Sequence, residues 1–101
     1  MSKRGHQLLT KELRKKLPAL RSTKTSNPIA QVKFFSPYSD WTWYAIEFDG
    51  DDIFFGLVQG FEEELGYFSL KELDETMYAG VPAVERDCYW TPRPISQVVK
   101  G

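Results

Sequence analysis

The chain has 101 residues and a mass of 11.7 kDa, with 42% hydrophobic residues, 27% charged residues and a formal net charge of −1. A chain of this length forms one domain with its own hydrophobic core. The composition excludes a disordered chain, a disulfide scaffold and a strongly basic nucleic-acid packing protein. Aromatic residues are frequent, at 15%. We therefore expect a single domain, residues 1–101, in which aromatic rings dominate the core or a surface.

The net charge conceals an uneven distribution along the chain. Residues 1–33 contain nine Lys or Arg and a single acid, Glu12, whereas residues 34–101 contain four Lys or Arg and thirteen acids. All fifteen aromatic residues lie between Phe34 and Trp90. Two interpretations stay open. Either a basic helix packs beside an acidic sheet and the charges offset each other, or the basic part faces an anionic partner such as nucleic acid.

The sequence carries no sign of a secretion signal or a membrane span. Only Leu8 and Leu9 follow the charged N-terminus before Lys11, so an apolar signal region is absent. The longest apolar runs are a few residues, far short of the roughly 20 that a membrane helix needs. With Cys88 as the single cysteine, the sequence predicts a cytoplasmic protein without a membrane partner.

The N-terminal third is expected to contain one short helix. Residues 1–7 are polar and we expect them to be disordered. Thr10 is a suitable N-cap for a helix over residues 11–17, which Pro18 ends because proline disfavours a helical conformation in the preceding residue. Leucines at three- and four-residue steps form one apolar stripe: Leu9, Leu13, Leu17 and Leu20. Residues 21–28 are polar and rich in turn-forming residues, which predicts a flexible loop.

Four strands are predicted next, at residues 30–35, 41–49, 53–59 and 64–68. Short turns connect these strands, so neighbours are antiparallel and form a meander. In the second strand, strict alternation places on one face Trp41, Trp43, Ala45 and Glu47. It places on the other face Thr42, Tyr44, Ile46 and Phe48.

A helix is expected after the sheet. Ser69 and Glu72 have the spacing of a capping box, which predicts a helix over residues 70–76. Residues 84–90 are expected to form a short extended segment, and residues 94–99 a last helical turn. The predicted fold class is α+β: an antiparallel four-stranded meander sheet flanked by a short N-terminal helix and one or two C-terminal helices.

Signatures of common catalytic and cofactor sites are missing from the sequence. His6 and Cys88 are the only residues of their types, so no zinc-ligand spacing exists. No phosphate-binding glycine loop, dinucleotide-binding motif or serine nucleophile motif occurs. We therefore expect no metal and no cofactor.

Four acids and one arginine interrupt apolar or aromatic segments: Glu47, Glu64, Glu85, Asp87 and Arg86. Three interpretations of this set stay open. It forms a salt-bridge network at a sheet edge with Arg86 bound to an acid, a binding site for a cationic or polar ligand, or a general acid/base pair. The last option requires at least two carboxyl groups to converge in one pocket.

Aromatic residues of the sheet form a second candidate site. If part of the sheet is uncovered, Trp41, Trp43 and Tyr67 mark a partner surface, and if both faces are covered these rings belong to the core. A stacking platform for single-stranded nucleic acid is a further option, but the acidic character of this part of the chain argues against it. Basic candidates for nucleic-acid contact lie on the first helix: Lys11, Arg14, Lys15 and Lys16.

Seven short strings carry a family resemblance: Leu8–Glu12, Leu17–Leu20, Val32–Phe35, Trp41–Tyr44, Phe54–Val58, Glu64–Ser69 and Glu85–Asp87. In this order and at this spacing, they resemble the small bacterial family called domain of unknown function 2958, over residues 8–98. The resemblance implies occurrence on plasmids, phages and integrative elements, with an accessory or anti-defence role. It implies no activity, no cofactor and no role for any residue.

These observations predict a non-enzymatic binding module of mobile-element origin that acts through a protein partner or a nucleoprotein complex. The residues expected to contact the partner are Trp41, Trp43, Glu47, Glu64, Tyr67, Glu85, Arg86 and Asp87. Two alternatives stay open: nucleic-acid binding through the basic N-terminal third, and a small enzyme that uses the carboxylates.

Overall fold

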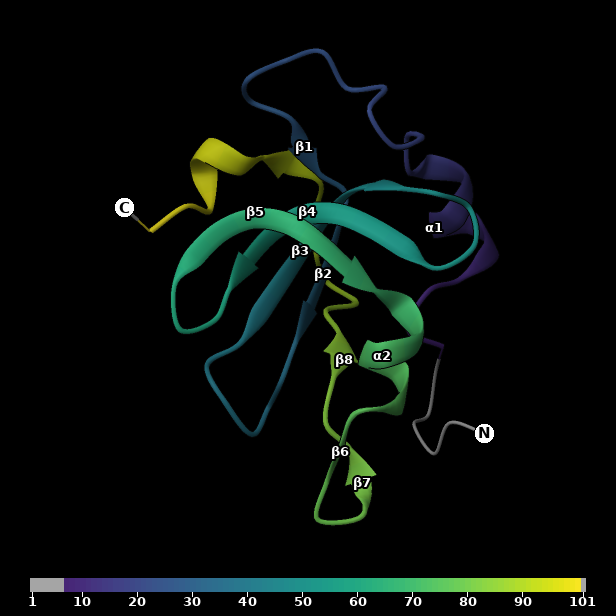
Figure 1. The fold of residues 1–101 in the computed structure, drawn as a ribbon, viewed down its shortest axis with the longest axis vertical. Coiled ribbons are helices and arrows are strands. Elements are labelled where there is room, and N and C mark those ends of the chain that lie inside the picture. Colours follow the sequence, from purple (N-terminus) through teal and green to yellow (C-terminus); the bar gives the residue numbers. More distant parts are fainter. Residues whose placement is uncertain (1–6, 101) are drawn as a thin grey trace.

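A computed structural model describes residues 7–100 of the chain (Figure 1). Its helical elements are α1 (Lys11–Lys16), α2 (Leu70–Glu75) and the 3-10 turn η1 (Ile95–Gln97). Its strands are β1 (Ile29–Ala30), β2 (Val32–Phe35), β3 (Thr42–Phe48), β4 (Ile53–Gln59), β5 (Glu63–Ser69), β6 (Met77–Tyr78), β7 (Val81–Pro82), β8 (Glu85–Arg86) and β9 (Arg93–Pro94). The disorder expected at the N-terminus falls, except for Gln7, outside the described residues.

The central sheet has five strands in the order β5-β4-β3-β2-β8, and every neighbouring pair is antiparallel. The meander from β2 to β5 confirms the antiparallel sheet, but the predicted number of four strands is wrong. After β5 the chain runs through α2 and the β6–β7 hairpin to the far edge of the sheet, where Arg86 pairs with Phe34. Extended structure is predicted over residues 84–90, but the charged pair in β8 has no hydrophobic alternation, so only its pairing with β2 shows that it joins the sheet.

Two further antiparallel pairs lie outside the central sheet. The predicted first strand is interrupted at Gln31, and β1 pairs with β9. The sequence pattern did not predict the β6–β7 hairpin, whose turn residues Ala79 and Gly80 have positive φ angles of 50° and 84°. Two successive left-handed residues are typical of a tight hairpin turn, but Ala-Gly lacks the Asn or Asp that usually signals one.

Both α-helices begin where the sequence predicts. The side-chain oxygens of Thr10 and Ser69 each accept a hydrogen bond from the backbone N–H three residues further on, at 3.2 and 3.1 Å. The first helix ends before Leu17, whose ψ of 124° is extended because Pro18 follows it. Each helix has only six residues, so packing against the sheet rather than helix propensity stabilises it.

A β-bulge in β3 changes which side chains share a face of the sheet. The pairing with β4 is irregular between Ala45 and Glu47, which makes Ile46 the extra residue. Phe48 therefore packs in the same cluster as Ala45 and Trp43, while Ile46 belongs to the cluster on the other face. The prediction that Glu47 shares a face with Trp43 is wrong, because strict alternation does not include the extra residue.

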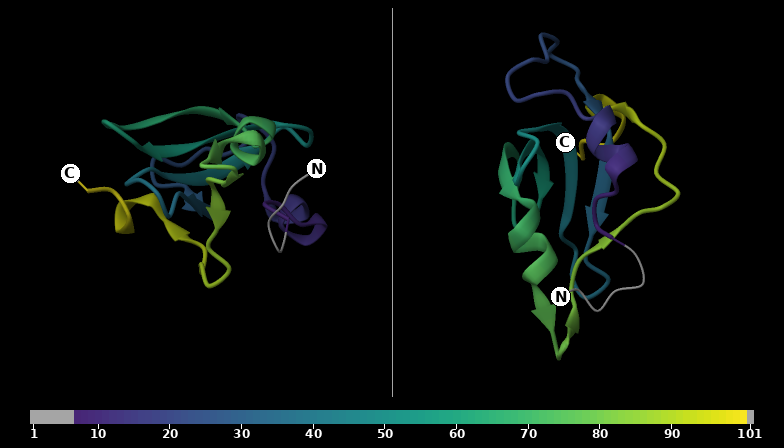
Figure 2. Two further views of the ribbon diagram at one scale, coloured as in Figure 1. Left: turned by 90° about the horizontal axis from the view of Figure 1, so that it is seen from below. Right: turned by 90° about the vertical axis from the view of Figure 1, so that its right-hand side faces the viewer.

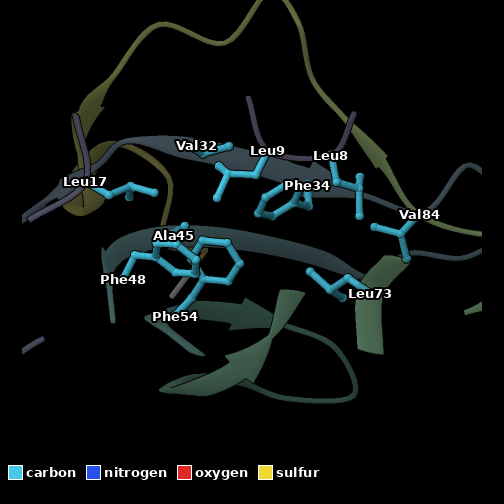
Figure 3. Packing of buried hydrophobic residues seen from close by; sticks show 10 residues of the cluster. All are labelled: Leu8, Leu9, Leu17, Val32, Phe34, Ala45, Phe48, Phe54, Leu73 and Val84. Atoms are coloured by element: carbon cyan, nitrogen blue, oxygen red, sulfur yellow. The ribbon is translucent and has the colours of Figure 1, made fainter. Parts of the chain in front are cut away.

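One face of the sheet, here called the helix face, packs against α2 and residues 8–17. Its core cluster, shown in Figure 3, consists of Leu8, Leu9, Leu17, Val32, Phe34, Ala45, Phe48, Phe54, Leu73 and Val84. Phe54 lies at its centre, with ring centroids 4.5 Å from Phe48, 5.1 Å from Phe68 and 5.5 Å from Phe34. Aromatic burial of this kind is the main stabilising contribution in a small domain.

The opposite face, here called the C-terminal face, is covered near β2 and β3 by residues 90–98. Its cluster consists of Ala30, Tyr44, Ile46, Leu57 and Ile95, with Trp90 and Val98 packed against it. Figure 2 shows α1 and the C-terminal segment on different sides of the sheet. Both faces are therefore covered at their centres, and the surfaces open to a partner lie at the ends and edges of the sheet.

Candidate binding surface

A groove lies at one end of the sheet, between the β2–β3 turn and the β6–β7 hairpin. It has a volume of about 300 Å³, and we call it the aromatic groove. Its large lining side chains are Tyr38, Trp41, Trp43, Met77, Tyr78 and Val84. The other lining residues are small, among them Ser36, Ser39 and Thr76. The surface inside the groove is therefore largely apolar.

Ring contacts fix the shape of the aromatic groove. Tyr38 from the β2–β3 turn stacks on Tyr78 from the hairpin, with ring centroids 4.6 Å apart and planes 15° apart. Trp41 contacts Trp43 at 5.9 Å and meets Phe61 edge to face at 5.3 Å. Offset and edge-to-face arrangements of this kind each contribute about 0.5–1.5 kcal/mol beyond the area they bury. The rings thus hold two distant segments of the chain together around an open space.

The groove residues are accessible to a partner. The exposed fractions of Tyr38, Met77 and Tyr78 are 47%, 48% and 55%, and Trp41 and Trp43 are partly buried. Within residues 7–100, no acceptor binds the indole N–H of either tryptophan. An accessible groove with two free indole donors can bind a ligand by apolar contact and by hydrogen bonds.

The groove carries no positive charge of its own. The segments that line it, residues 36–43 and 76–84, contain the single acid Asp40 and no Lys, Arg or His. Aromatic platforms that bind single-stranded nucleic acid combine stacking with a basic channel along the phosphates. The charge distribution therefore favours an uncharged or basic ligand over nucleic acid.

Tyr67 and Glu64 lie away from the groove. Tyr67 is 58% exposed on the C-terminal face of β5, where its ring contacts Phe55 at 5.2 Å. Glu64 is exposed on the same strand and pairs with Val58 of β4. Tyr67 and the tryptophan pair belong to opposite faces of the sheet, so the structure does not bring the predicted aromatic residues together.

Glu47 is buried, with an exposed fraction of 5%. Its two carboxylate oxygens accept hydrogen bonds from the backbone N–H groups of Arg21 and Thr23, at 2.8 and 2.9 Å. Burial alone would raise the pKa of this carboxyl, but these hydrogen bonds and the charge of Lys24 together hold the pKa below its usual value. Glu47 thus anchors the 21–28 loop, including the left-handed Arg21 (φ 66°), and does not face a partner.

Arg86 and Asp87 contact different parts of the chain. The Arg86 guanidinium lies on the helix face, where it donates hydrogen bonds to the carbonyl oxygens of Gln7 and Leu8. Asp87 forms an ion pair with Lys33 at 3.7 Å and accepts a hydrogen bond from a backbone N–H two residues on. Glu85 pairs with β2 at the sheet edge. These residues fasten the N-terminal segment and the chain after β8 to the sheet.

The candidate carboxylates do not converge on one pocket. Glu64 and Glu85 lie on opposite edge strands, β5 and β8, and Glu47 is buried against the 21–28 loop. Within residues 7–100, no group of three or more His, Cys, Asp or Glu could hold a metal ion. This arrangement gives no geometric support to the acid/base alternative.

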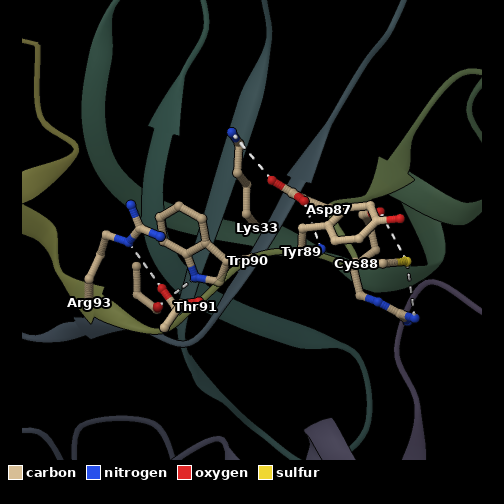
Figure 4. Close-up of polar contacts among 9 residues, drawn as sticks. Lys33, Asp87, Cys88, Tyr89, Trp90, Thr91 and Arg93 are labelled. Carbon is tan, nitrogen blue, oxygen red and sulfur yellow. Dashed lines mark hydrogen bonds and ion pairs between the residues drawn. The ribbon is translucent and has the colours of Figure 1, made fainter.

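Trp90 has a structural role that the sequence did not predict. Its indole N–H donates a hydrogen bond to the carbonyl oxygen of Ala30 at 2.9 Å. Figure 4 shows Trp90 with Arg93 and Lys33 close to its ring. The Arg93 guanidinium lies 4.2 Å from the ring centroid, and the Lys33 ammonium 5.7 Å away. The aromatic-basic pattern around residues 90–93 was the available signal for this cation–π cluster.

The basic candidates on α1 are all exposed. Arg14 lies against the protein, with its guanidinium 5.4 Å from the Phe48 ring and 3.5 Å from the carbonyl oxygen of Gly50. Lys11, Lys15 and Lys16 have no ion pair with any residue between 7 and 100. The acidic turns of the sheet therefore do not neutralise these three lysines through direct contact.

Comparisons with known proteins agree with the motifs in the sequence. A family model described as "Protein of unknown function (DUF2958)" matches residues 7–100. No curated protein and no solved structure matches the chain. No helix in residues 7–100 has the length and apolar character needed to cross a membrane. The resemblance is thus confirmed, while the mobile-element setting stays a prediction. Because the match covers almost the whole chain, this protein belongs to the DUF2958 family.

Proposed function

We propose that this domain is a non-enzymatic protein-binding module that holds an extended, apolar segment of a partner protein in the aromatic groove. The observation that carries the proposal is the cluster of accessible rings around an open space of about 300 Å³. Grooves lined by Tyr and Trp are typical binding sites for extended, proline-containing peptides, whose conformation costs little entropy to fix. A mobile-element setting is part of this proposal as a prediction from the family resemblance.

The composition of the groove supports a peptide ligand. Proline and aliphatic side chains pack well against flat aromatic rings, and the indole N–H groups of Trp41 and Trp43 can donate to peptide carbonyl oxygens. Asp40 lies in the chain between Ser39 and Trp41, which both line the groove, and this acid favours a basic residue beside the apolar segment. Aromatic anchors in such sites usually carry most of the binding energy.

A display library of linear peptides tests this proposal. The library is selected for binding to the wild-type domain, and the dissociation constant of each enriched peptide is measured by calorimetry. We expect enriched peptides to contain proline or aliphatic residues. Tyr78→Ala should weaken their binding at least about tenfold, because truncation of an aromatic anchor costs more than about 1.4 kcal/mol.

The matched control is Tyr89→Ala. Tyr89 is another exposed tyrosine, at 95%, and it does not line the groove. This variant should bind the enriched peptides like the wild type. If no peptide is enriched, or if the Tyr78 and Tyr89 variants bind equally well, the groove is not the binding site.

Exposed lysines on α1 favour a second candidate function, which is non-specific contact with nucleic acid. Lys11, Lys15 and Lys16 are free to neutralise phosphates, and each such contact makes affinity fall as salt rises. We expect duplex DNA to bind weakly at low salt and the triple Lys→Ala variant to show a shallower salt dependence. Equal salt dependence, or no binding at low salt, would remove this candidate. Arg14 stays unchanged in the variant because it packs on the core.

A further inference from the structure

The outer edge of β5 is open. This strand has seven residues and lies at the end of the central sheet, and no other strand in residues 7–100 pairs with its outer side. The opposite edge is β8, which has only two residues. Short edge strands resist further pairing, whereas a long edge offers a row of free N–H and C=O groups. The structure therefore has one long edge suited to strand addition.

The side chains of β5 give little protection against pairing. On the C-terminal face, Leu65 and Tyr67 are 51% and 58% exposed. Glu63 is engaged within the chain, because one of its carboxylate oxygens accepts hydrogen bonds from the Gln59 side chain and the backbone N–H of Lys100. Charges on an edge strand normally block pairing. Glu64 is the one exposed acid of β5, on the helix face, and it lies beside an apolar centre formed by Leu65 and Tyr67.

We propose that β5 pairs antiparallel with β5 of a second copy of this chain, centred on Gly66. This inference is independent of the peptide-binding proposal, because it uses a different surface. When a two-fold axis relates two antiparallel strands, equivalent side chains of the two copies point to the same side of the joined sheet. Residues that lie directly opposite each other also point to the same side, so one residue of β5 must lie opposite its own copy. The possible registers are therefore few and can be compared directly.

The register centred on Gly66 best matches the side chains on the C-terminal face. It places Leu65 of each copy opposite Tyr67 of the other, so that both exposed apolar residues pair with an apolar residue. A register centred on Leu65 places Tyr67 opposite an acid, Glu63, and a register centred on Tyr67 places Leu65 opposite Ser69. Apolar cross-strand pairs contribute favourably to sheet pairing. β5 is thus self-complementary on its C-terminal face in one register, and on the helix face this register places Glu64 opposite Phe68.

Gly66 itself supports this centre. The monomer does not require a glycine there, because its φ is not in the left-handed region and a Cβ at this position would meet no atom within 4 Å. Its cross-strand neighbour Gly56 is different, since a Cβ there would overlap the carbonyl oxygen of Tyr44. A glycine inside a strand weakens it, and such positions often mark the close approach of another backbone. Pairing between copies gives a reason for this residue.

Charge substitution tests both the edge and the register by sedimentation velocity over a concentration series. We expect the wild-type chain to form dimers. Leu65→Lys with Tyr67→Lys places like charges opposite each other, so the dimer dissociation constant should rise at least about tenfold. Leu65→Lys with Tyr67→Glu places opposite charges face to face in the Gly66 register. This second variant should dimerise more tightly than the first, and high salt should weaken it.

The matched control is Val81→Lys, which introduces the same charge at an exposed apolar residue of the β6–β7 hairpin. It should dimerise like the wild type. A wild-type chain that stays monomeric, or a Lys/Lys variant that still dimerises, overturns the proposal. Equal weakening of the Lys/Lys and Lys/Glu variants overturns the Gly66 register. Circular dichroism checks folding, and the single variant Leu65→Lys, with a smaller weakening expected, replaces any double variant that unfolds.

Discussion

Two tryptophan regions of this domain are built in opposite ways. Trp90 donates its indole N–H to the Ala30 carbonyl and has two cationic groups on its ring. Trp41 contacts the rings of Trp43 and Phe61, and Trp43 also packs against the helix-face core cluster. Within residues 7–100, no acceptor binds the indole N–H of either residue. The first region has its polar and apolar requirements satisfied inside the chain. The second region is packed on one side, but it leaves its indole N–H groups without an acceptor in residues 7–100 and part of its ring surface exposed at an open groove.

This difference separates a structural aromatic residue from a candidate binding residue. A buried or half-buried tryptophan usually finds a partner for its N–H when its role is to stabilise the fold. Trp90 follows that rule and connects the C-terminal segment to β1. The groove tryptophans do not, which is the pattern expected of a surface that gains its contacts from a ligand. Substitutions in the two regions should therefore affect different measurements.

The largest expected effect comes from Trp90→Ala. Loss of this ring removes its packing on Tyr44, the hydrogen bond to Ala30 and both cation–π contacts, so the free energy of unfolding should fall by about 3 kcal/mol. Urea denaturation measures the change. Trp41→Ala should cost about 2 kcal/mol through the loss of its two ring contacts, but it should abolish binding of peptides selected on the groove. Equal stability losses for the two variants would contradict the view that Trp90 stabilises the fold while Trp41 serves binding.

The next effect comes from Gly60→Ala. A Cβ at residue 60 would lie 2.5 Å from two ring carbons of Trp41, so the indole must move and the groove loses its shape. Overpacking of this kind costs about 2 kcal/mol, and it should also shift the tryptophan fluorescence. Gly66→Ala, compared at a concentration where the chain is monomeric, is the matched control, because within the chain its Cβ would meet no atom within 4 Å. If Gly60→Ala changes neither the stability nor the tryptophan fluorescence, the Trp41 ring does not pack against residue 60.

The sequence predicted local features well and long-range ones poorly. Both helix N-caps depend on a few neighbouring residues, and Thr10 and Ser69 were identified correctly. The bulge at Ile46 depends on the partner strand, so alternation alone assigned Glu47 to the wrong face. The sequence predicted Trp41 and Trp43 as candidate residues but not the other side of the groove. Tyr78 contacts Tyr38 because of the β6–β7 hairpin, which no sequence signal predicted.

A smaller effect is expected from Glu47→Gln, and it depends on pH. The pKa of Glu47 in the folded protein is below its ordinary value of 4.5, so its stabilising contribution is present above that pH and is lost as pH falls toward the folded value. Near neutral pH the variant should lose about 1.5 kcal/mol, because a neutral amide replaces a carboxylate that accepts two backbone hydrogen bonds.

Urea denaturation of both proteins across the acidic range measures this contribution. The stability difference between wild type and the Glu47 variant should shrink below pH 4.5. Asp49 also has a lowered pKa, because it accepts hydrogen bonds from the backbone N–H groups of Asp51 and Asp52, but it is present in both proteins and cancels in the difference. A difference that is constant with pH would mean that the Glu47 carboxylate does not anchor the 21–28 loop.

The smallest effect distinguishes two neighbouring basic residues of α1. Arg14 packs its guanidinium on the Phe48 ring, an exposed cation–π contact, so Arg14→Ala should lower the free energy of unfolding by about 0.5–1 kcal/mol. Lys15 has no ion pair within residues 7–100, and Lys15→Ala should change stability by less than about 0.5 kcal/mol. The two variants have the same charge, so thermal denaturation at equal salt compares packing alone. If Lys15→Ala is the more destabilising of the two, α1 does not dock on the sheet through Arg14. The lysines of α1 would then stabilise the fold rather than form a surface for anionic partners.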